Sequence, residues 1–334
     1  MSGSKISHIC AFDTLLKRNV PHILEMIFLS LDYESFKTCH EVCSAWYKLL
    51  TLEKSLLRKK AKLTYKSKMW QDKNELNDLC AEGDAEGVSY LLKKGVNQWI
   101  NSKGINVVGM TPLLIAAKKG HKDVIQVLLN RGARPKEANR RGENALHHAV
   151  KSGNKDVVKL FLDLGVIPKA DKTGRTPLHW PARMGQTDLV QLLLDAGADP
   201  NIVDESGVTP LQDAAMFGHK AVVKLLLNKG AEPNKANADG QTALHASVGA
   251  CHKEMVKLLL DHGADPNIAD ENEEAPLHCA AFWGYTDVVR LLLKRGANKL
   301  LRDKKKQTPL DMACKNRHKD VIKLLHDECE KADQ

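Results

Sequence analysis

A repeat of about 33 residues occupies most of this 334-residue chain and constrains its fold more than any other feature. Equivalent positions of successive copies are separated by 33, 32, 33, 33, 33 and 33 residues, and they are held by Thr111, Asn144, Thr176, Thr209, Thr242, Ala275 and Thr308. A more divergent copy begins at Asn74. Repetition at a fixed period predicts a solenoid, in which each unit buries its apolar surface against the next unit.

Each copy carries the signals of two helices. A threonine that can cap the helix is followed by proline at the first helical position, as in Thr209-Pro210, and then by leucine and a pair of small residues. The second helix has an apolar stripe at helical spacing, as in Val222, Val223 and Leu226, and it ends at a glycine such as Gly230. Two helices of this length per period predict an all-α chain.

The motif T-P-L-H-x-A-A at this period resembles the ankyrin repeat. The resemblance implies an all-α ankyrin-repeat solenoid of helix–turn–helix units joined by β-turn fingers, preceded here by a small helical domain. We place eight repeats at residues 74–108, 109–141, 142–173, 174–206, 207–239, 240–272, 273–305 and 306–330.

Composition and motifs argue against several other classes of protein. Eight cysteines form no C-x-x-C pair, and no segment resembles a signal peptide or a membrane span, so we expect a cytoplasmic and/or nuclear protein. No catalytic motif is present, and we expect no enzyme activity, no catalytic residue, no metal and no cofactor. We assign eight histidines to structural positions of the repeat: His121, His147, His179, His219, His245, His252, His278 and His318.

The first 73 residues do not follow the repeat. We divide them into an N-terminal arm (1–18), a segment of three short amphipathic helices (19–62) and a basic linker (63–73). The first of these helices begins at Pro21, and the segment exposes more apolar surface than about 40 residues can bury by themselves. Such a surface needs a covering partner, either the neighbouring repeats or another protein.

Residues 20–58 resemble an F-box, whose most specific piece here is the V-C-x-x-W sequence from Val42 to Trp46. F-boxes dock the Skp adaptor, which connects to a cullin and a RING subunit. The resemblance implies that the chain is a non-enzymatic substrate receptor of an Skp–cullin–F-box ubiquitin ligase that is monomeric by itself. It places these residues at the adaptor contact or in the helical core: Val20, Pro21, Ile23, Leu24, Ile27, Leu31, Val42 and Trp46.

Two alternatives stay open. The N-terminal segment can be a cap for the solenoid, which would leave an ankyrin scaffold or sequestering protein without a ligase role. Residues 1–73 also carry 13 Lys/Arg against 7 Asp/Glu, which is +6 of the net charge of +9. Such a cluster can bind nucleic acid, but it lacks interleaved aromatic residues, so we expect a solvated surface instead.

The positions that the repeat leaves free are the candidates for binding the unknown protein substrate. Two variable residues follow each small pair, and we predict that they line the concave side together with the residue after the first histidine position of the motif. In successive repeats this residue is Ile115, His148, Trp180, Asp213, Ala246, Cys279 and Met312. Large apolar residues gather there, and Gly249-Ala250 leave a dip between them. The predicted substrate-binding residues are Trp180, Met184, Phe217, Phe282 and Trp283.

Departures from the repeat give further expectations. Pro181 is predicted in a helix interior, and Cys251 and Arg317 replace a loop glycine. Cys80 and Cys314 stand at the second small position and are expected in the core. The fingers alternate in charge: Lys136, Arg140 and Arg141 are followed by Asp199, Asp204 and Glu205, then by Asp265, Asp270, Glu271, Glu273 and Glu274, and finally by Lys299, Arg302, Lys304, Lys305 and Lys306.

Overall fold

The computed structural model describes residues 71–104 and 108–330, and it divides the chain into two units between Ile100 and Asn101. The arm, the segment 19–62 and most of the basic linker lie outside the described residues. The same holds for all eight residues predicted to bind the adaptor, Val20, Pro21, Ile23, Leu24, Ile27, Leu31, Val42 and Trp46.

The described part of the first unit holds helical residues 71–82, α6 (Ala85–Lys93) and the short 3-10 helix η1 (Val96–Trp99). Asp84 caps α6 by accepting a hydrogen bond of 2.8 Å from the Gly87 amide. Leu76, Cys80 and Leu92 are fully buried. Cys80 therefore serves in the core, as predicted.

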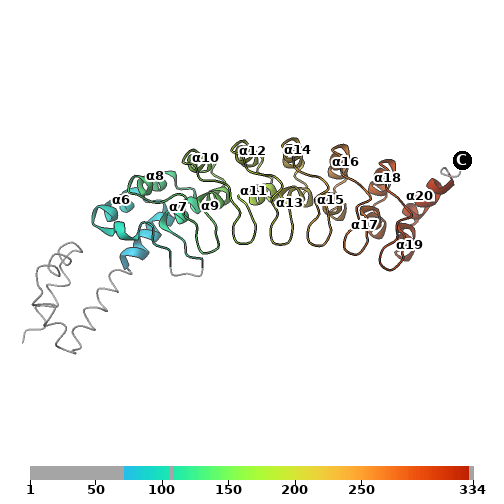
Figure 1. The fold of residues 1–334 in the computed structure, drawn as a ribbon, viewed down its shortest axis with the longest axis horizontal. Helices are drawn as coiled ribbons and strands as arrows, with labels where there is room; N and C mark the ends of the chain where they lie inside the picture. Colours follow the sequence, from blue (N-terminus) through green and yellow to red (C-terminus); the bar gives the residue numbers. More distant parts are fainter. Residues whose placement is uncertain (1–70, 105–107, 331–334) are drawn as a thin grey trace, which may run out of the picture. The chain divides into compact units, whose positions relative to one another are not determined.

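The second unit is a stack of helix pairs (Figure 1). We call the first helix of each pair inner and the second outer. The inner helices are α7 (Pro112–Lys119), α9 (Ala145–Ser152), α11 (His179–Arg183), α13 (Pro210–Met216), α15 (Ala243–Gly249), α17 (Pro276–Trp283) and α19 (Pro309–Lys315). The outer helices are α8 (Lys122–Asn130), α10 (Lys155–Asp163), α12 (Thr187–Asp195), α14 (Lys220–Asn228), α16 (Lys253–Asp261), α18 (Thr286–Lys294) and α20 (Lys319–Glu330).

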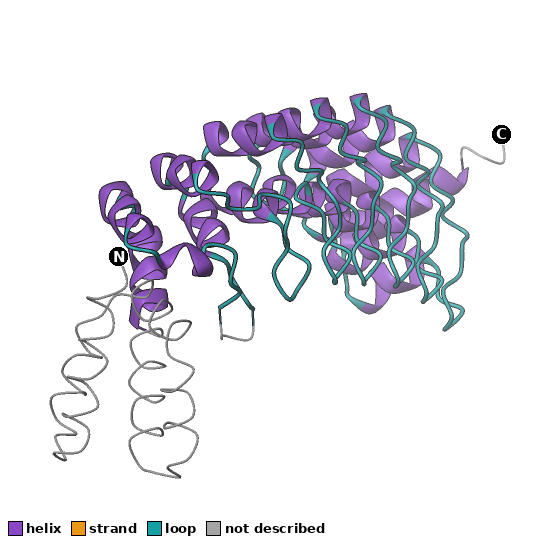
Figure 2. Cartoon of the chain, turned by 60° about the vertical axis from the view of Figure 1, so that its left-hand side comes forward, coloured by secondary structure: helices purple, strands orange, loops and turns teal. Residues whose placement is uncertain are grey.

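Consecutive inner helices pack against each other, and so do consecutive outer helices. The loops between repeats project as fingers on the side of the inner helices, where they lie next to one another (Figures 1 and 2). The described residues contain no strand. The all-α solenoid predicted from the period is confirmed.

The inner helices begin where the sequence predicted. The Thr209 hydroxyl accepts from the Gln212 amide at 3.1 Å, and the Gln212 side chain accepts from the Thr209 amide at 2.8 Å, which closes a capping box. Other repeats use histidine for the second bond. His245 Nδ1 accepts from the Thr242 amide at 3.1 Å, and its Nε2 lies 3.1 Å from the Glu274 carbonyl oxygen of the next finger.

These histidine contacts join each helix start to the following repeat, and His147, His179 and His278 form the same pair of bonds. Burial lowers the pKa of His147, His179, His245 and His278, which favours the neutral ring. The structural role predicted for these histidines is confirmed.

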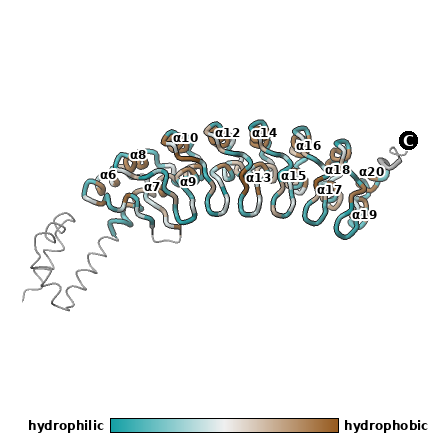
Figure 3. Tube along the Cα trace, in the orientation of Figure 1, coloured by the Kyte–Doolittle hydropathy of each residue, from teal (hydrophilic) through white to brown (hydrophobic). Residues whose placement is uncertain are grey.

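The core runs along the stack between the two rows of helices. Val222, Val223 and Leu226 of α14 are fully buried, and equivalent residues are buried in the other repeats. In Figure 3 apolar segments recur in the helices of each repeat. Each repeat thus contributes a layer to one continuous core.

Two expectations from the sequence are wrong. Pro181 does not lie in a helix interior, because α11 begins only at His179 and places Pro181 in its first turn. Amides of the first turn have no partner within the helix, so the missing N–H of proline leaves no bond unmade. Cys314 is exposed, because α19 is the last inner helix described and no following inner helix covers it.

Candidate functional site

The inner helices present a row of side chains that the packing of the repeat does not use. The two residues after the small pair, which we call the variable pair, are exposed or half-buried in every repeat of the second unit. In sequence order the variable pairs are Lys118-Lys119, Lys151-Ser152, Arg183-Met184, Met216-Phe217, Gly249-Ala250, Phe282-Trp283 and Lys315-Asn316. Because consecutive inner helices pack side by side, the variable pairs form one continuous surface.

Large apolar side chains are concentrated on this surface. Among the described residues ten large hydrophobic side chains are exposed, and six of them lie on or at the end of α11, α13 and α17. We call these six the aromatic face: Trp180, Met184, Met216, Phe217, Phe282 and Trp283. It contains all five residues predicted to bind substrate, together with Met216. Trp283 is 57% exposed and Trp180 is 38% exposed, so neither is covered by a neighbouring repeat.

The first part of the aromatic face is held by contacts between repeats. The Arg183 guanidinium lies over the Phe217 ring, 4.8 Å from the ring centroid. The Phe217 ring stacks on His219 at 6.5 Å between centroids, and His219 Nε2 lies 2.8 Å from the Arg183 carbonyl oxygen. These contacts order Phe217 before a partner arrives, which reduces the entropy lost on binding.

The second part has a comparable arrangement. Phe282 and Trp283 form an edge-to-face pair with centroids 5.1 Å apart. The Phe282 carbonyl oxygen lies 2.9 Å from His318 Nε2 of the next repeat. Between the two parts, α15 presents only Gly249 and Ala250, so no large side chain of a variable pair separates the two aromatic groups.

The position that follows the first histidine position of the repeat was expected to enlarge this surface, and that expectation is wrong for three of its seven residues. Trp180 is exposed and Ile115, Ala246 and Cys279 are half-buried, whereas His148, Asp213 and Met312 are buried. The inner helices that carry these side chains pack against neighbouring inner helices, so their exposure depends on side chains about 33 residues away in sequence. The sequence named Asp213 and His148 but gave no signal that either is buried.

Asp213 is a buried carboxylate with an unsatisfied oxygen. It is 6% exposed, and its Oδ2 atom has no hydrogen-bond partner among the described residues. Burial raises the pKa of Asp213 to about 6, while the charges of Arg175 and Arg183 act in the opposite direction. Arg175 is already engaged, because its Nε and one terminal nitrogen each lie 3.1 Å from the Asp204 carboxylate.

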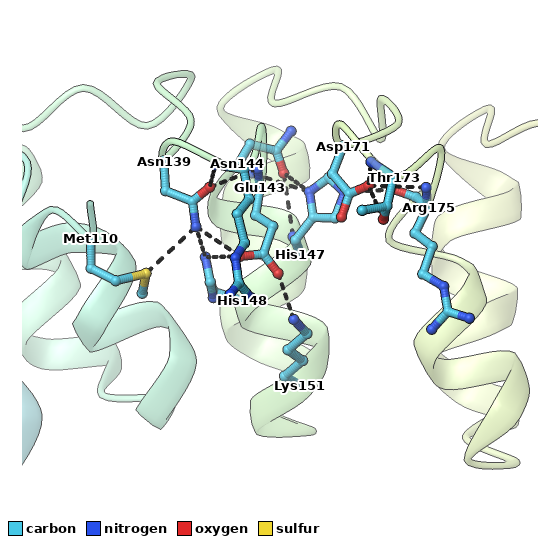
Figure 4. A network of polar contacts seen from close by, with 11 residues as sticks. Met110, Asn139, Glu143, Asn144, His147, His148, Lys151, Asp171, Thr173 and Arg175 are labelled. Carbon is cyan, nitrogen blue, oxygen red and sulfur yellow. Dashed lines mark hydrogen bonds and ion pairs between the residues drawn. The ribbon is translucent and has the colours of Figure 1, made fainter. Parts of the chain in front are cut away.

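A second buried polar group joins a finger to an inner helix (Figure 4). Glu143 accepts hydrogen bonds of 2.7 Å from Lys151 Nζ and from Asn139 Nδ2, and His148 Nε2 lies 3.6 Å from the same carboxylate. Burial acts to raise the pKa of Glu143, but the bonds from Lys151 and Asn139 hold it well below its ordinary value. Burial lowers the pKa of His148, so the ring is neutral at pH 7.

This group shows that the base of a finger borders the variable pair of the same repeat, since Lys151 belongs to the pair and Glu143 to the finger. The candidate binding surface therefore includes the variable pairs and the bases of the adjoining fingers. Within residues 71–104 and 108–330 no cluster of histidine, cysteine and acidic side chains could hold a metal ion. In the same ranges no helix has the length and apolar character needed to cross a membrane.

A family model for ankyrin repeats (3 copies) matches residues 43–139, 132–204, 188–270, 211–303 and 265–334. These matches cover more than half of the sequence, and the chain belongs to the ankyrin-repeat family. Ankyrin repeats indicate a protein–protein interaction module. No F-box domain is found, and the first ankyrin match begins inside the segment predicted to be an F-box. A search of curated proteins finds no match.

Proposed function

We propose that this chain is a non-enzymatic substrate receptor of an Skp–cullin–F-box ubiquitin ligase, whose ankyrin stack binds the substrate and whose residues 19–62 dock the adaptor. The observation that supports substrate binding is the aromatic face. Aromatic side chains provide most of the energy of many protein interfaces, because they bury a large apolar area at a small cost in rotamer entropy.

The ligase part of the proposal rests on sequence. The run from Val20 to Arg58, with V-C-x-x-W at its centre, resembles the adaptor-docking module. The alternative function is an ankyrin scaffold or sequestering protein, for which residues 19–62 cap the stack. The two functions differ in one property, which is binding of the Skp adaptor.

The test separates the two binding activities in full-length protein expressed in cells under proteasome inhibition. The double variant Pro21→Ala/Leu24→Ala removes the start of a helix and one apolar anchor. It should no longer capture the Skp adaptor but should capture substrate as the wild type does. Phe217→Ala and Trp283→Ala should each weaken substrate binding by about 1–4 kcal/mol and leave adaptor capture unchanged.

The matched control is Leu164→Ala, because Leu164 is an exposed apolar residue at the end of outer helix α10. It should bind substrate like the wild type. Undiminished adaptor capture by the Pro21/Leu24 double variant would refute the ligase role. Equal substrate binding by the wild type and both aromatic variants would refute the aromatic face as the recognition surface.

A further inference from the structure

Some basic residues of the outer helices form ion pairs between neighbouring repeats, for example Lys155 with Asp188 at 3.1 Å and Lys253 with Asp287 at 2.9 Å. The same arrangement joins Lys122 to Asp156, Lys220 to Glu254, Lys229 to Asp195 and Arg295 to Asp261. Other lysines of the same helices, Lys159, Lys224 and Lys257, are exposed and form no ion pair with any described residue.

The inner side of residues 109–183 carries a group of exposed basic residues that form no ion pair with any described residue. They lie in the variable pair of α7 and on the next two fingers: Lys118, Lys119, Lys136, Arg141 and Lys172. We call these five the basic face.

The acidic residues of the same region have partners other than the basic face. Glu137 pairs with Arg134 at 2.8 Å, and Glu143 pairs with Lys151 at 2.7 Å. Asp171 accepts hydrogen bonds from the backbone amides of Thr173 and Arg175. The basic face therefore offers positive charge to an external group.

The basic face leads directly into the aromatic face. Arg183 belongs to the variable pair of α11, and its guanidinium covers the ring of Phe217 on the next repeat. Further along the stack the fingers become acidic, with Glu205, Glu271 and Glu273 all exposed. A partner lying on the inner side thus meets positive charge first, then apolar side chains flanked by negative charge, and at the end of the stack the basic finger with Lys304, Lys305 and Lys306.

We infer that the partner is a protein segment with an acidic block next to an apolar block, with the acidic block on the basic face and the apolar block on the aromatic face. The acidic fingers beside the aromatic face disfavour placement of the acidic block there, since like charges in contact are repulsive. This inference rests on the proposed function, because it assigns the chemistry of the partner that the aromatic face binds.

The experiment selects ligands for the immobilised full-length chain from a random peptide display library. We expect the enriched peptides to carry aspartate or glutamate on one side of an aromatic or aliphatic cluster. Their binding should weaken about 10- to 100-fold when Lys119, Arg141 and Lys172 are all changed to glutamate, because each exposed ion pair alters affinity only a few-fold. The triple glutamine variant should bind with intermediate affinity.

The matched control reverses the same number of charges on the outer helices, as Lys159→Glu, Lys224→Glu and Lys257→Glu. These lysines are exposed and form no ion pair with any described residue. The control should bind the peptides like the wild type. Thermal melting followed by circular dichroism establishes that all variants are folded.

Three outcomes would overturn the inference. If the selected peptides lack an excess of acidic residues and bind the wild type and the glutamate variant equally, the inference of an acidic block in the partner is refuted. The proposed function survives this result if Trp283→Ala still weakens peptide binding. If neither Phe217→Ala nor Trp283→Ala weakens peptide binding, the aromatic face is refuted as the recognition surface as well. Tighter, charge-dependent binding of a single-stranded DNA oligonucleotide would assign the basic face to nucleic acid instead.

Discussion

Replacement of Asp213 by asparagine should stabilise the protein at neutral and alkaline pH. Asp213 is 6% exposed, and burial raises its pKa from 3.8 to about 6. The folded state therefore binds the proton more tightly than the unfolded state does. The stability that this proton provides is complete below the unfolded pKa of 3.8 and is lost as the pH rises through about 6.

The magnitude follows from this difference in pKa. About two pKa units correspond to about 3 kcal/mol over the whole titration, and to about 2 kcal/mol between about pH 4.5 and about pH 8. Asparagine has the size of a protonated aspartate but does not ionise. The wild type should therefore lose about 2 kcal/mol relative to Asp213→Asn across this interval.

Urea unfolding followed by far-ultraviolet circular dichroism measures the difference between the two proteins at both pH values. The comparison at low pH is the internal control, because Asp213 is then mostly protonated and any cost of the amide itself appears there. A difference that does not change with pH would refute the reasoning. It would mean that Arg183 or Arg175 pairs with the Asp213 carboxylate in solution.

Three further predictions concern the repeats themselves. Cys251 has a φ of 57° where most other repeats have glycine, so Cys251→Gly should raise stability by about 1 kcal/mol in urea unfolding, and no gain would contradict the assumed strain. A β-carbon at Gly185 or Gly284 would lie 2.5 Å from the histidine ring of the next repeat, and the residue that holds this histidine position in the repeat after Cys251 is Tyr285. Tyr285→His should therefore destabilise the wild type but not the Cys251→Gly variant. Equal effects of Tyr285→His in the two backgrounds of a double-mutant cycle would disprove this coupling. Leu226→Ala, in the middle of the stack, should lower the free energy of unfolding by about 2–5 kcal/mol because the side chain is fully buried. Leu91→Ala in the first repeat should lower it less and should expose nearby amides to hydrogen exchange. Equal losses of unfolding free energy in the two variants would contradict a stack whose stability differs along its length.

The surface that carries the proposed functions was only partly predictable. The period identified the variable pairs, and all five aromatic and methionine residues selected from the sequence are exposed on the inner side. The burial of Asp213 and His148 was not predictable, because it depends on the side chains of the adjacent repeats. The ion pairs of Lys155 and Lys253 on the outer helices also depend on acidic residues one repeat away.

The sequence by itself determined the features that depend on local backbone chemistry or on the repeat. These are the helix starts at Thr209 and Thr242, the structural histidines and the order of the helices, since capping and hydrophobic periodicity act within a few residues. The F-box resemblance of residues 19–62 is also a conclusion from sequence, and it stays a prediction.

The tertiary structure decided which polar and small residues are buried against an adjacent repeat and which stay exposed. It placed Pro181 in the first turn of a shortened helix, exposed Cys314 at the end of the stack and left Asp213 buried with an unsatisfied oxygen. Each of these outcomes depends on which groups one repeat brings against the next. Burial and ion pairing are properties of the assembled stack, and no single repeat contains them.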